Sequence, residues 1–242
     1  MTGLRIAVLR HEPETGLGTF AALLDRARVD YHVVETLGGA LPEAGAFDGT
    51  IALGGSLNVY DPRLLETRRW IRNSVLRGLP FLGVCLGGQL LASALGAVVE
   101  RQARPEVGVH DVYLTDAAEH DPLFSGLPGR FAVFGWHEDC FGLPPRAVPL
   151  AGSIACTYQA FRFGAGAYGL QFHSEVRPDD LGAWATVPGY RKMLDRAGAE
   201  ADVMRDLERI APALDSLAGQ LLGRWLHLVS GIAAVERLGV AF

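Results

Sequence analysis

The sequence has little lysine and cysteine and no long apolar segment. Lys192 is the only lysine among 22 basic residues, which are scattered along a chain of net charge −5. Proteins that bind nucleic acids or anionic membranes usually carry a basic patch, so we expect neither partner. No stretch approaches the roughly 20 apolar residues that span a bilayer. The apolar stretch near the N-terminus is also too short for a signal peptide.

The cysteine content argues against a disulfide framework and against zinc. The chain has three cysteines, Cys85, Cys140 and Cys156, and none belongs to a CxxC pair. We therefore expect a reducing, cytoplasmic location and no metal site. With 242 residues, 49% of them hydrophobic, the chain is long enough to bury the core of one large domain.

Apolar segments and amphipathic segments alternate over the first hundred residues. Strands are predicted at 4–9, 31–35, 47–53 and 80–84, and helices at 18–28, at 61–77 and from Cys85 to about 96. Such strands indicate a parallel sheet with helices on both faces. Shorter strand-like segments follow at 107–114, 130–135, 148–152, 158–163 and 167–172. The predicted fold class is α/β, with a central mixed, mainly parallel sheet.

The C-terminal part of the chain is predicted to be helical. Apolar residues recur there at spacings of three and four, at Val203, Leu207, Ile210, Leu214, Leu217, Leu221, Trp225 and Val229. Pro212 should kink or divide this helix. We expect a domain of residues 1–180 and a helical extension, 181–242, packed on it. The alternative is that the stripe forms the interface of a homo-oligomer or binds another partner.

Cys85 lies where a predicted buried strand ends and a helix begins, in the segment FLGVCLGGQ. The surrounding glycines give G-x-C-x-G-G, the cysteine form of a nucleophile elbow. Such a turn is strained and needs small neighbours, and the N-terminus of the following helix favours a thiolate. Cys85 is therefore a candidate nucleophile. The alternative is a buried cysteine of the core.

His173 is the histidine best placed to act as a base. It ends a strand-like segment, and Glu175 follows two residues later, on the same face of an extended chain. The carboxylate can fix the tautomer of the imidazole and leave its other nitrogen toward Cys85. Backbone N–H donors for an oxyanion are expected at Leu86 and in the loop that contains Gly54 and Gly55. An ordinary glycine turn is the alternative for that loop.

Three motifs together resemble one family: LGGS-x-x-x-YD at 53–61, G-V-C-L-G-G-Q at 83–89 and G-L-Q-F-H-x-E at 169–175. They are similar to class I, triad-type glutamine amidotransferases, and especially to free-standing proteins similar to the amidotransferase domain of GMP synthase. The resemblance covers roughly residues 4–176. It implies a flavodoxin-like three-layer fold and hydrolysis of the glutamine amide through a γ-glutamyl thioester, without metal or organic cofactor.

The same resemblance implies roles for individual residues. It makes Cys85 the nucleophile, His173 the base and Glu175 the orienting carboxylate, and it forms the oxyanion hole from the backbone of Gly55 and Leu86. The expected substrate-binding residues are Gly54, Ser56, Gln89, His137 and Asp139. The last two belong to a W-H-x-D-x-F motif (136–141), for which packing is an equal alternative. One departure is Ser174, where the family usually has proline.

The substrate expected from the resemblance is glutamine or a γ-glutamyl small molecule. No P-loop-like or pyrophosphatase-type motif is visible, so the acceptor of the ammonia is not encoded here. A separate synthase subunit is one expected partner. The alternatives are a stand-alone hydrolase of γ-glutamyl peptides or amines and a non-catalytic regulatory subunit.

Two other enzyme or binding classes remain as alternatives. Residues 16–21 fit G-x-G-x-x-A, with Glu35 ending the next strand, as in dinucleotide-binding modules. Acidic residues and a proline separate this motif from the first strand, which weakens that alternative. An α/β-hydrolase would instead take its acid from Asp111, Asp121 or Asp139.

Overall fold

A single mixed sheet organises the chain in the computed structural model, which describes residues 3–197 and 200–237. Its strand order is β2-β1-β3-β4-β9-β8-β7-β5-β6. The strands are β1 (Arg5–Arg10), β2 (Asp30–Glu35), β3 (Gly49–Ala52), β4 (Phe81–Val84), β5 (Val99–Leu114), β6 (Arg130–Phe141), β7 (Val148–Gly152), β8 (Ala160–Phe163) and β9 (Ala167–Leu170).

The helices separate the early strands and then close the chain. They are α1 (Thr19–Arg26), α2 (Leu65–Leu76), α3 (Leu86–Ala94), α4 (Asp180–Trp184), α5 (Pro188–Ala197) and α6 (Glu200–Arg237). Short 3₁₀ helices lie at Ala44–Ala46, Pro62–Leu64 and Asp116–His120. Asp61 caps the second of these, since its side chain accepts from the N–H of Arg63.

The parallel part of the sheet has the flavodoxin-like strand order. β2, β1, β3, β4 and β9 pair in parallel with one another, while antiparallel pairing joins β9 to β8 and then β8, β7, β5 and β6. The predicted mixed sheet is confirmed, but parallel pairing is confined to one end of it, and antiparallel pairing is as frequent. In such a sheet, ligands bind outside the carboxyl ends of the strands. The carboxyl ends of β1, β3, β4 and β9 therefore define the edge where a site is expected.

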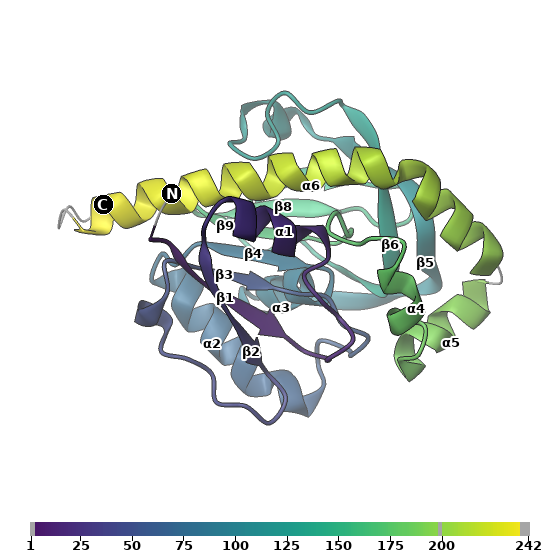
Figure 1. The fold of residues 1–242 in the computed structure, drawn as a ribbon, viewed down its shortest axis with the longest axis horizontal. Coiled ribbons are helices and arrows are strands. Elements are labelled where there is room, and N and C mark those ends of the chain that lie inside the picture. Colours follow the sequence, from purple (N-terminus) through teal and green to yellow (C-terminus); the bar gives the residue numbers. More distant parts are fainter. Residues whose placement is uncertain (1–2, 198–199, 238–242) are drawn as a thin grey trace.

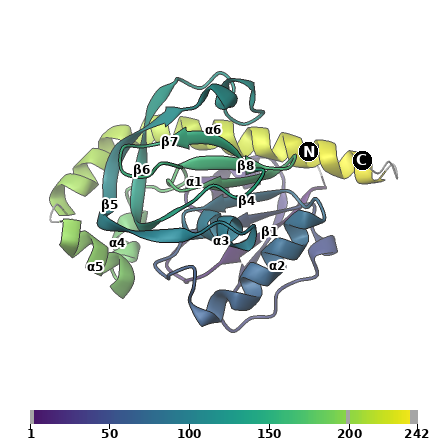
Figure 2. The same cartoon turned by 180° about the vertical axis from the view of Figure 1, so that it is seen from behind.

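Helices cover both faces of the parallel part, so that the molecule has three layers (Figures 1 and 2). α1 and α6 pack on one face, with Phe20, Leu24 and Trp225 in a common cluster with β1 and β3. α2 and α3 pack on the other, through Ile71 and Leu90. β1, β3, β4 and β9 are largely apolar because both of their faces are buried, whereas the edge strand β2 is exposed or half-buried.

The strands of the β5–β6 pair are longer than predicted. The predictions stopped at 107–114 and 130–135, whereas the strands cover Val99–Leu114 and Arg130–Phe141. The register shifts between Arg101 and Glu106. Polar residues and Pro105 interrupt the apolar pattern of β5, because most of this strand is exposed or half-buried, whereas β6 is mostly buried.

Helix α6 continues through Pro212 instead of being divided. Its N-terminal part turns away from the axis of the remainder (Figure 1). Every residue of the predicted stripe, from Val203 to Val229, is buried within the chain. The stripe therefore packs on its own sheet, and the alternative of an exposed oligomer interface along it is wrong. No helix in the described part of the chain is long and apolar enough to cross a membrane.

One expectation about cysteine is wrong. Cys140, at the end of β6, forms a disulfide with Cys156 in the loop before β8. The odd count and the lack of a CxxC pair gave no sign of this pair, because pairing depends on tertiary proximity. Cys85 is the remaining free cysteine, and it is buried.

Candidate active site

The turn from β4 to α3 holds Cys85 in a strained conformation. Its φ is +50°, a backbone angle that residues other than glycine rarely adopt. A Cβ on Gly83 would lie 2.5 Å from the backbone of Gly87, and one on Gly87 would lie 2.1 Å from the carbonyl oxygen of Ala52. The glycines of the motif are thus required because strand and helix approach one another so closely.

His173 and Glu175 meet as the sequence predicted. Nδ1 of His173 lies 2.6 Å from Oε1 of Glu175, and both side chains are almost completely buried. Nε2 of His173 has no hydrogen-bond partner among the described residues. The backbone N–H of His173 donates to the carbonyl of Phe134 in β6, which fixes the segment beyond β9.

The charges around His173 favour its protonated form. Burial by itself lowers the pKa of this imidazole, but the charges of Glu175 and Cys85 outweigh burial and raise the pKa to about 10. The protonated imidazole has a proton that it can give to a leaving group.

Gly54 lies against both His173 and Cys85 and allows their side chains to approach each other. A Cβ on Gly54 would lie 2.7 Å from Cε1 and 3.6 Å from Nε2 of His173, and 3.5 Å from the Cβ of Cys85. The loop after β3 thus runs directly past both side chains. Only a glycine leaves them the space to face each other.

The two predicted oxyanion donors lie beside Cys85. Leu86 is the first residue of α3, and a Cβ on Gly55 would lie 2.9 Å from Cδ2 of Leu86. Neither backbone N–H donates a hydrogen bond within the described part of the chain. Both donors are therefore free for an anionic oxygen.

A small pocket opens beside Cys85. Its volume is about 30 Å³, which is room for roughly one or two water molecules. The residues of the pocket include Gly55, Ser56, Gln89, Arg101, His137, Asp139 and Met193.

The expected substrate-binding residues differ in what they offer to this pocket. The amide of Gln89 donates to the carbonyl of Asp139, while the carboxylate of Asp139 accepts from Asn58 and lies 3.3 Å from Nε of Arg101. Ser56 uses its N–H and its hydroxyl on the carboxylate of Glu12. Ser56 is thus engaged within the protein.

His137 is hydrogen-bonded through Nδ1, whereas its Nε2 lies beside a carboxylate but has no hydrogen-bond partner among the described residues. Nδ1 lies 3.1 Å from the carbonyl oxygen of Asp139, and Nε2 lies 3.1 Å from the carboxylate of Glu106. Glu106 also accepts from Gln159. This buried polar cluster favours the packing alternative for His137.

Sequence reasoning missed Gln171, which lies two residues before His173. Its Nε2 is 3.8 Å from Sγ of Cys85, and its Oε1 accepts from Gln89. Gln171 therefore joins the candidate nucleophile to the expected glutamine-binding residue. Its place in the G-L-Q-F-H-x-E motif was the available signal.

An aromatic cluster from the C-terminal helices was also missed. The ring of Trp184 lies 4.8 Å from that of His173 and is stacked on Tyr190 at 5.3 Å. Trp136 contacts both Trp184 and Tyr190. The sequence gave no signal for this cluster, since its members are separated along the chain.

The two rival site assignments do not fit this geometry. Gly18 precedes α1, and the N–H of Thr19 donates to the carbonyl of Glu175, so this helix N-terminus is not open to a pyrophosphate. Asp111 pairs with Arg130, and Asp121 pairs with Arg162. The carboxylate on His173 is that of Glu175.

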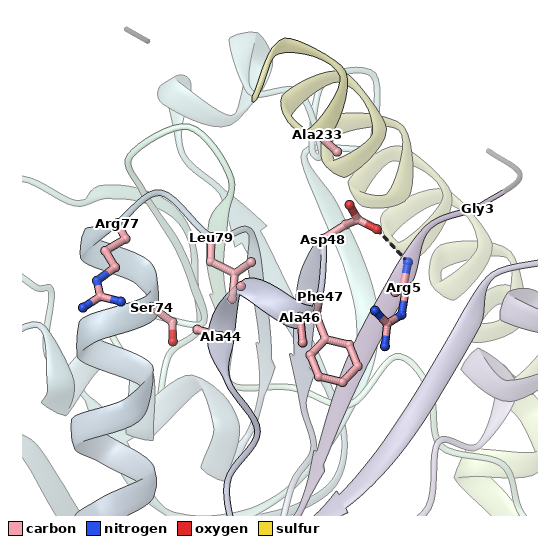
Figure 3. Close-up of a pocket in the computed structure, with 11 residues that line it drawn as sticks. Gly3, Arg5, Ala44, Ala46, Phe47, Asp48, Ser74, Arg77, Leu79 and Ala233 are labelled. Atoms are coloured by element: carbon pink, nitrogen blue, oxygen red, sulfur yellow. Dashed lines mark hydrogen bonds between the residues drawn. The ribbon is translucent and has the colours of Figure 1, made fainter. Parts of the chain in front are cut away.

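A larger pocket of about 520 Å³ lies at the amino ends of the strands (Figure 3). Arg5, Phe47, Asp48 and Arg77 line it, and the N–H of Arg5 donates to Asp48. None of the described residues that line it is a cysteine or a histidine. It is therefore separate from the Cys85 site, which lies at the carboxyl edge. Across the described residues, no group of three or more potential ligands is placed to hold a metal ion.

Comparison with known families decides the assignment. Residues 20–184 match the family model for glutamine amidotransferase class-I. This chain belongs to the class I glutamine amidotransferases. The resemblance of its three motifs to that family is confirmed, as is the flavodoxin-like fold.

The relatives of this amidotransferase include GMP synthases, which are longer than this chain and match it over part of their length. A GMP synthase of Thermomicrobium roseum is 40% identical over 136 residues, which are 56% of this chain and 24% of the relative. A GMP synthase of Thermus thermophilus is 37% identical over 186 residues, 75% of this chain and 34% of the relative. The chain thus spans a quarter to a third of these synthases.

Among solved structures, a glutamine amidotransferase from Thermotoga maritima is similar over almost its whole length. It is 29% identical with a TM-score of 0.83, and the match covers 93% of this chain and 99% of that one. A glutamine amidotransferase from Methylobacillus flagellatus is 25% identical with a TM-score of 0.82, covering 94% and 96%. The C-terminal helices are therefore within the aligned fold of free-standing relatives.

Proposed function

We propose that this amidotransferase hydrolyses the side-chain amide of glutamine, with Cys85 as nucleophile, His173 as acid and base, and Glu175 as the orienting carboxylate. The observation that carries the proposal is the 2.6 Å contact between Nδ1 of His173 and Glu175. It leaves Nε2 unpartnered beside a cysteine on a strained strand–helix turn.

The reaction begins with attack on the amide. The thiolate of Cys85 forms a bond to the amide carbon, and the carbonyl oxygen takes up negative charge between the N–H groups of Gly55 and Leu86. The C–N bond then breaks, and His173 gives its Nε2 proton to the nitrogen, which leaves as ammonia. The product on the enzyme is a γ-glutamyl thioester of Cys85.

Water completes the cycle. His173 removes a proton from a water molecule that attacks the thioester carbon, and the C–S bond breaks to release glutamate and the Cys85 thiolate. Glu175 stabilises the imidazolium that this step forms. In this proposal the released ammonia passes to a synthase partner.

The small pocket supports glutamine over larger γ-glutamyl compounds. Met193 of α5 lines it, and the first turn of α5 lies so close that a Cβ on Gly189 would be 2.6 Å from Oγ of Ser56. These contacts leave little space in the pocket for a substrate bulkier than glutamine. A stand-alone γ-glutamyl hydrolase is the second candidate, because the same arrangement of Cys85, His173 and Glu175 would also cleave a γ-glutamyl peptide or amine bond.

The test is the release of glutamate from L-glutamine and from γ-glutamyl peptides by the purified protein. Cys85→Ala should abolish release without loss of folding. The matched control is Cys140→Ser with Cys156→Ser, which removes the other two sulfur atoms and should retain turnover. Activity in Cys85→Ala would refute the mechanism, and preference for the peptides would favour the hydrolase.

A further inference from the structure

The carboxylate of Glu12 joins two loops at the carboxyl edge of the sheet. Glu12 lies in the loop after β1, and Ser56 lies in the loop after β3, 44 residues later. Oε2 of Glu12 accepts from the N–H of Ser56 at 2.6 Å, and Oε1 accepts from its hydroxyl at 2.7 Å. Hydrogen bonds to an ionised group are about twice as strong as those between neutral groups. The loop after β3 is therefore held firmly against the loop after β1.

Glu12 is itself held in place by its neighbours. Its carbonyl oxygen accepts from both the N–H and the hydroxyl of Thr15, at 3.1 and 2.9 Å. The preceding residue, His11, is buried, and its Nδ1 lies 2.8 Å from Oγ1 of Thr36, just beyond β2. A carboxylate on a backbone that is fixed in this way can in turn fix the group that it binds.

The backbone of Gly55 is the part of the site that this contact restrains. Gly54 and Gly55 precede Ser56, and a glycine backbone rotates more freely than that of any other residue. A Cβ on Gly55 would lie 3.3 Å from Oε2 of Glu12 and 2.9 Å from Cδ2 of Leu86. Gly55 thus lies between the carboxylate and the first residue of α3. The hydrogen bond from the N–H of Ser56 restrains the planar peptide unit that joins this residue to Gly55.

Glu12 acts on the loop and not on the substrate. Both of its carboxylate oxygens are engaged by Ser56. Gly55 and Ser56 line the pocket beside Cys85, whereas Glu12 is not among the described residues that line it. A carboxylate near a developing oxyanion repels it, so that the negative charge of Glu12 gives the reaction no advantage. The advantage lies in the geometry that its two hydrogen bonds impose.

We propose that Glu12 is a positioning residue for the oxyanion hole. Through its hydrogen bonds to Ser56, its carboxylate orients the N–H of Gly55 toward the amide oxygen of the substrate. This inference rests on the proposed glutaminase function. No bond is made or broken at Glu12, and it exchanges no proton with the substrate. The substrate oxygen becomes negative only during the reaction, so that Glu12 affects kcat more than KM.

The test compares variants of the full chain. Glu12→Ala removes both hydrogen bonds, and we expect kcat for L-glutamine to fall about 10²-fold, as when one oxyanion donor is lost, with KM within about three-fold. Glu12→Gln should retain kcat within about three-fold, because its amide can accept from the N–H of Ser56 and donate to the hydroxyl oxygen. Glu12→Asp keeps the charge but withdraws the carboxylate by one methylene group, and should lower kcat about ten-fold.

A second reaction of Cys85 separates this role from a merely structural one. Iodoacetamide alkylates the thiolate by displacement of iodide, and this step forms no oxyanion. Glu12→Ala should therefore be alkylated at Cys85 at the wild-type rate while its hydrolysis of glutamine is slow. Glu14→Ala is the matched control, since Glu14 is an exposed residue of the same loop. It should retain both kcat and the alkylation rate.

Other results would overturn the inference. A kcat for Glu12→Ala within about three-fold of wild type would mean that the N–H of Gly55 is oriented without Glu12. Slowing of alkylation as large as that of hydrolysis would mean that the substitution disturbs Cys85 as a whole. If Glu12→Ala does not fold, equal kcat values in Glu12→Gln and Glu12→Asp would refute the inference. A wild-type protein that is alkylated at Cys85 but releases no glutamate would instead refute the proposed function, and the inference with it, which keeps the two failures apart.

Discussion

Gly54→Ala is the substitution whose effect follows most directly from the distances in the site. The new Cβ would lie 2.7 Å from Cε1 of His173, and an ordinary contact begins at 3.4 Å, so that the imidazole must move by about 0.7 Å. The ring has little space to move into, because its centroid lies only 4.8 Å from that of the Trp184 ring. The displacement would break its alignment with Cys85.

The expected magnitude separates activity from stability. Misplacing a reacting group by about 1 Å costs on the order of 10²-fold in rate, and we expect a loss of kcat/KM of that size. Overpacking by one methyl group costs about 1–3 kcal/mol of stability, which a domain of this size survives. Gly54 does not have a positive φ, so the effect is steric and not a strained backbone.

The assay is glutamate release together with thermal unfolding. Gly45→Ala is the control, since a Cβ there meets nothing within 4 Å, and it should retain wild-type kcat/KM. Iodoacetamide labelling of Cys85 reports whether the thiol remains reactive in Gly54→Ala. A folded Gly54→Ala protein with kcat/KM within three-fold of wild type would refute the placement of His173 against Cys85.

Three further predictions concern neighbouring residues. Glu175→Gln should lower kcat about 10²- to 10⁴-fold. Because the pKa of His173 is raised from 6.5 to about 10, its contribution to stability is complete below pH 6.5 and is lost as the pH rises toward 10. Thermal unfolding from pH 7 to 10 should therefore show a shallower fall of Tm in Glu175→Gln; an equal slope would contradict this. Ser174 has a buried hydroxyl without a partner among the described residues, so Ser174→Ala should retain kcat and unfold no earlier in denaturant, and a loss above 1 kcal/mol would argue for a hidden partner. Cys140→Ser with Cys156→Ser opens a loop with a sequence separation of 16 and should cost about 3 kcal/mol in urea unfolding while turnover persists; unchanged stability would show that the disulfide is absent in solution.

The sequence predicted the parallel half of the sheet well because β1, β3, β4 and β9 are buried on both faces. Its strands are short unbroken apolar segments, and glycines mark the turns. The same reasoning failed at the β5–β6 pair. Arg101 and Pro105 lie inside β5, where half-exposed positions leave no clean alternation to detect.

The residues of the candidate site were predictable to the extent that local motifs encode them. A cysteine between a strand and a helix, flanked by glycines, has few explanations, and a histidine with a glutamate two residues later in extended chain places both on one face. The roles of Cys85, His173 and Glu175 remain predictions. Their proximity required the parallel pairing of β4 with β9.

Other features depended wholly on the tertiary structure. Tyr190 and Trp184 reach the site from helices beyond the last strand, Ser56 is occupied by Glu12, and Cys140 finds Cys156 across a loop. By itself, the sequence determined the fold class, the family and the three motifs, since these are local patterns of burial, turn chemistry and residue type. The tertiary structure alone decided which side chains close over the site and which polar groups remain free, because those depend on contacts between residues far apart in the chain.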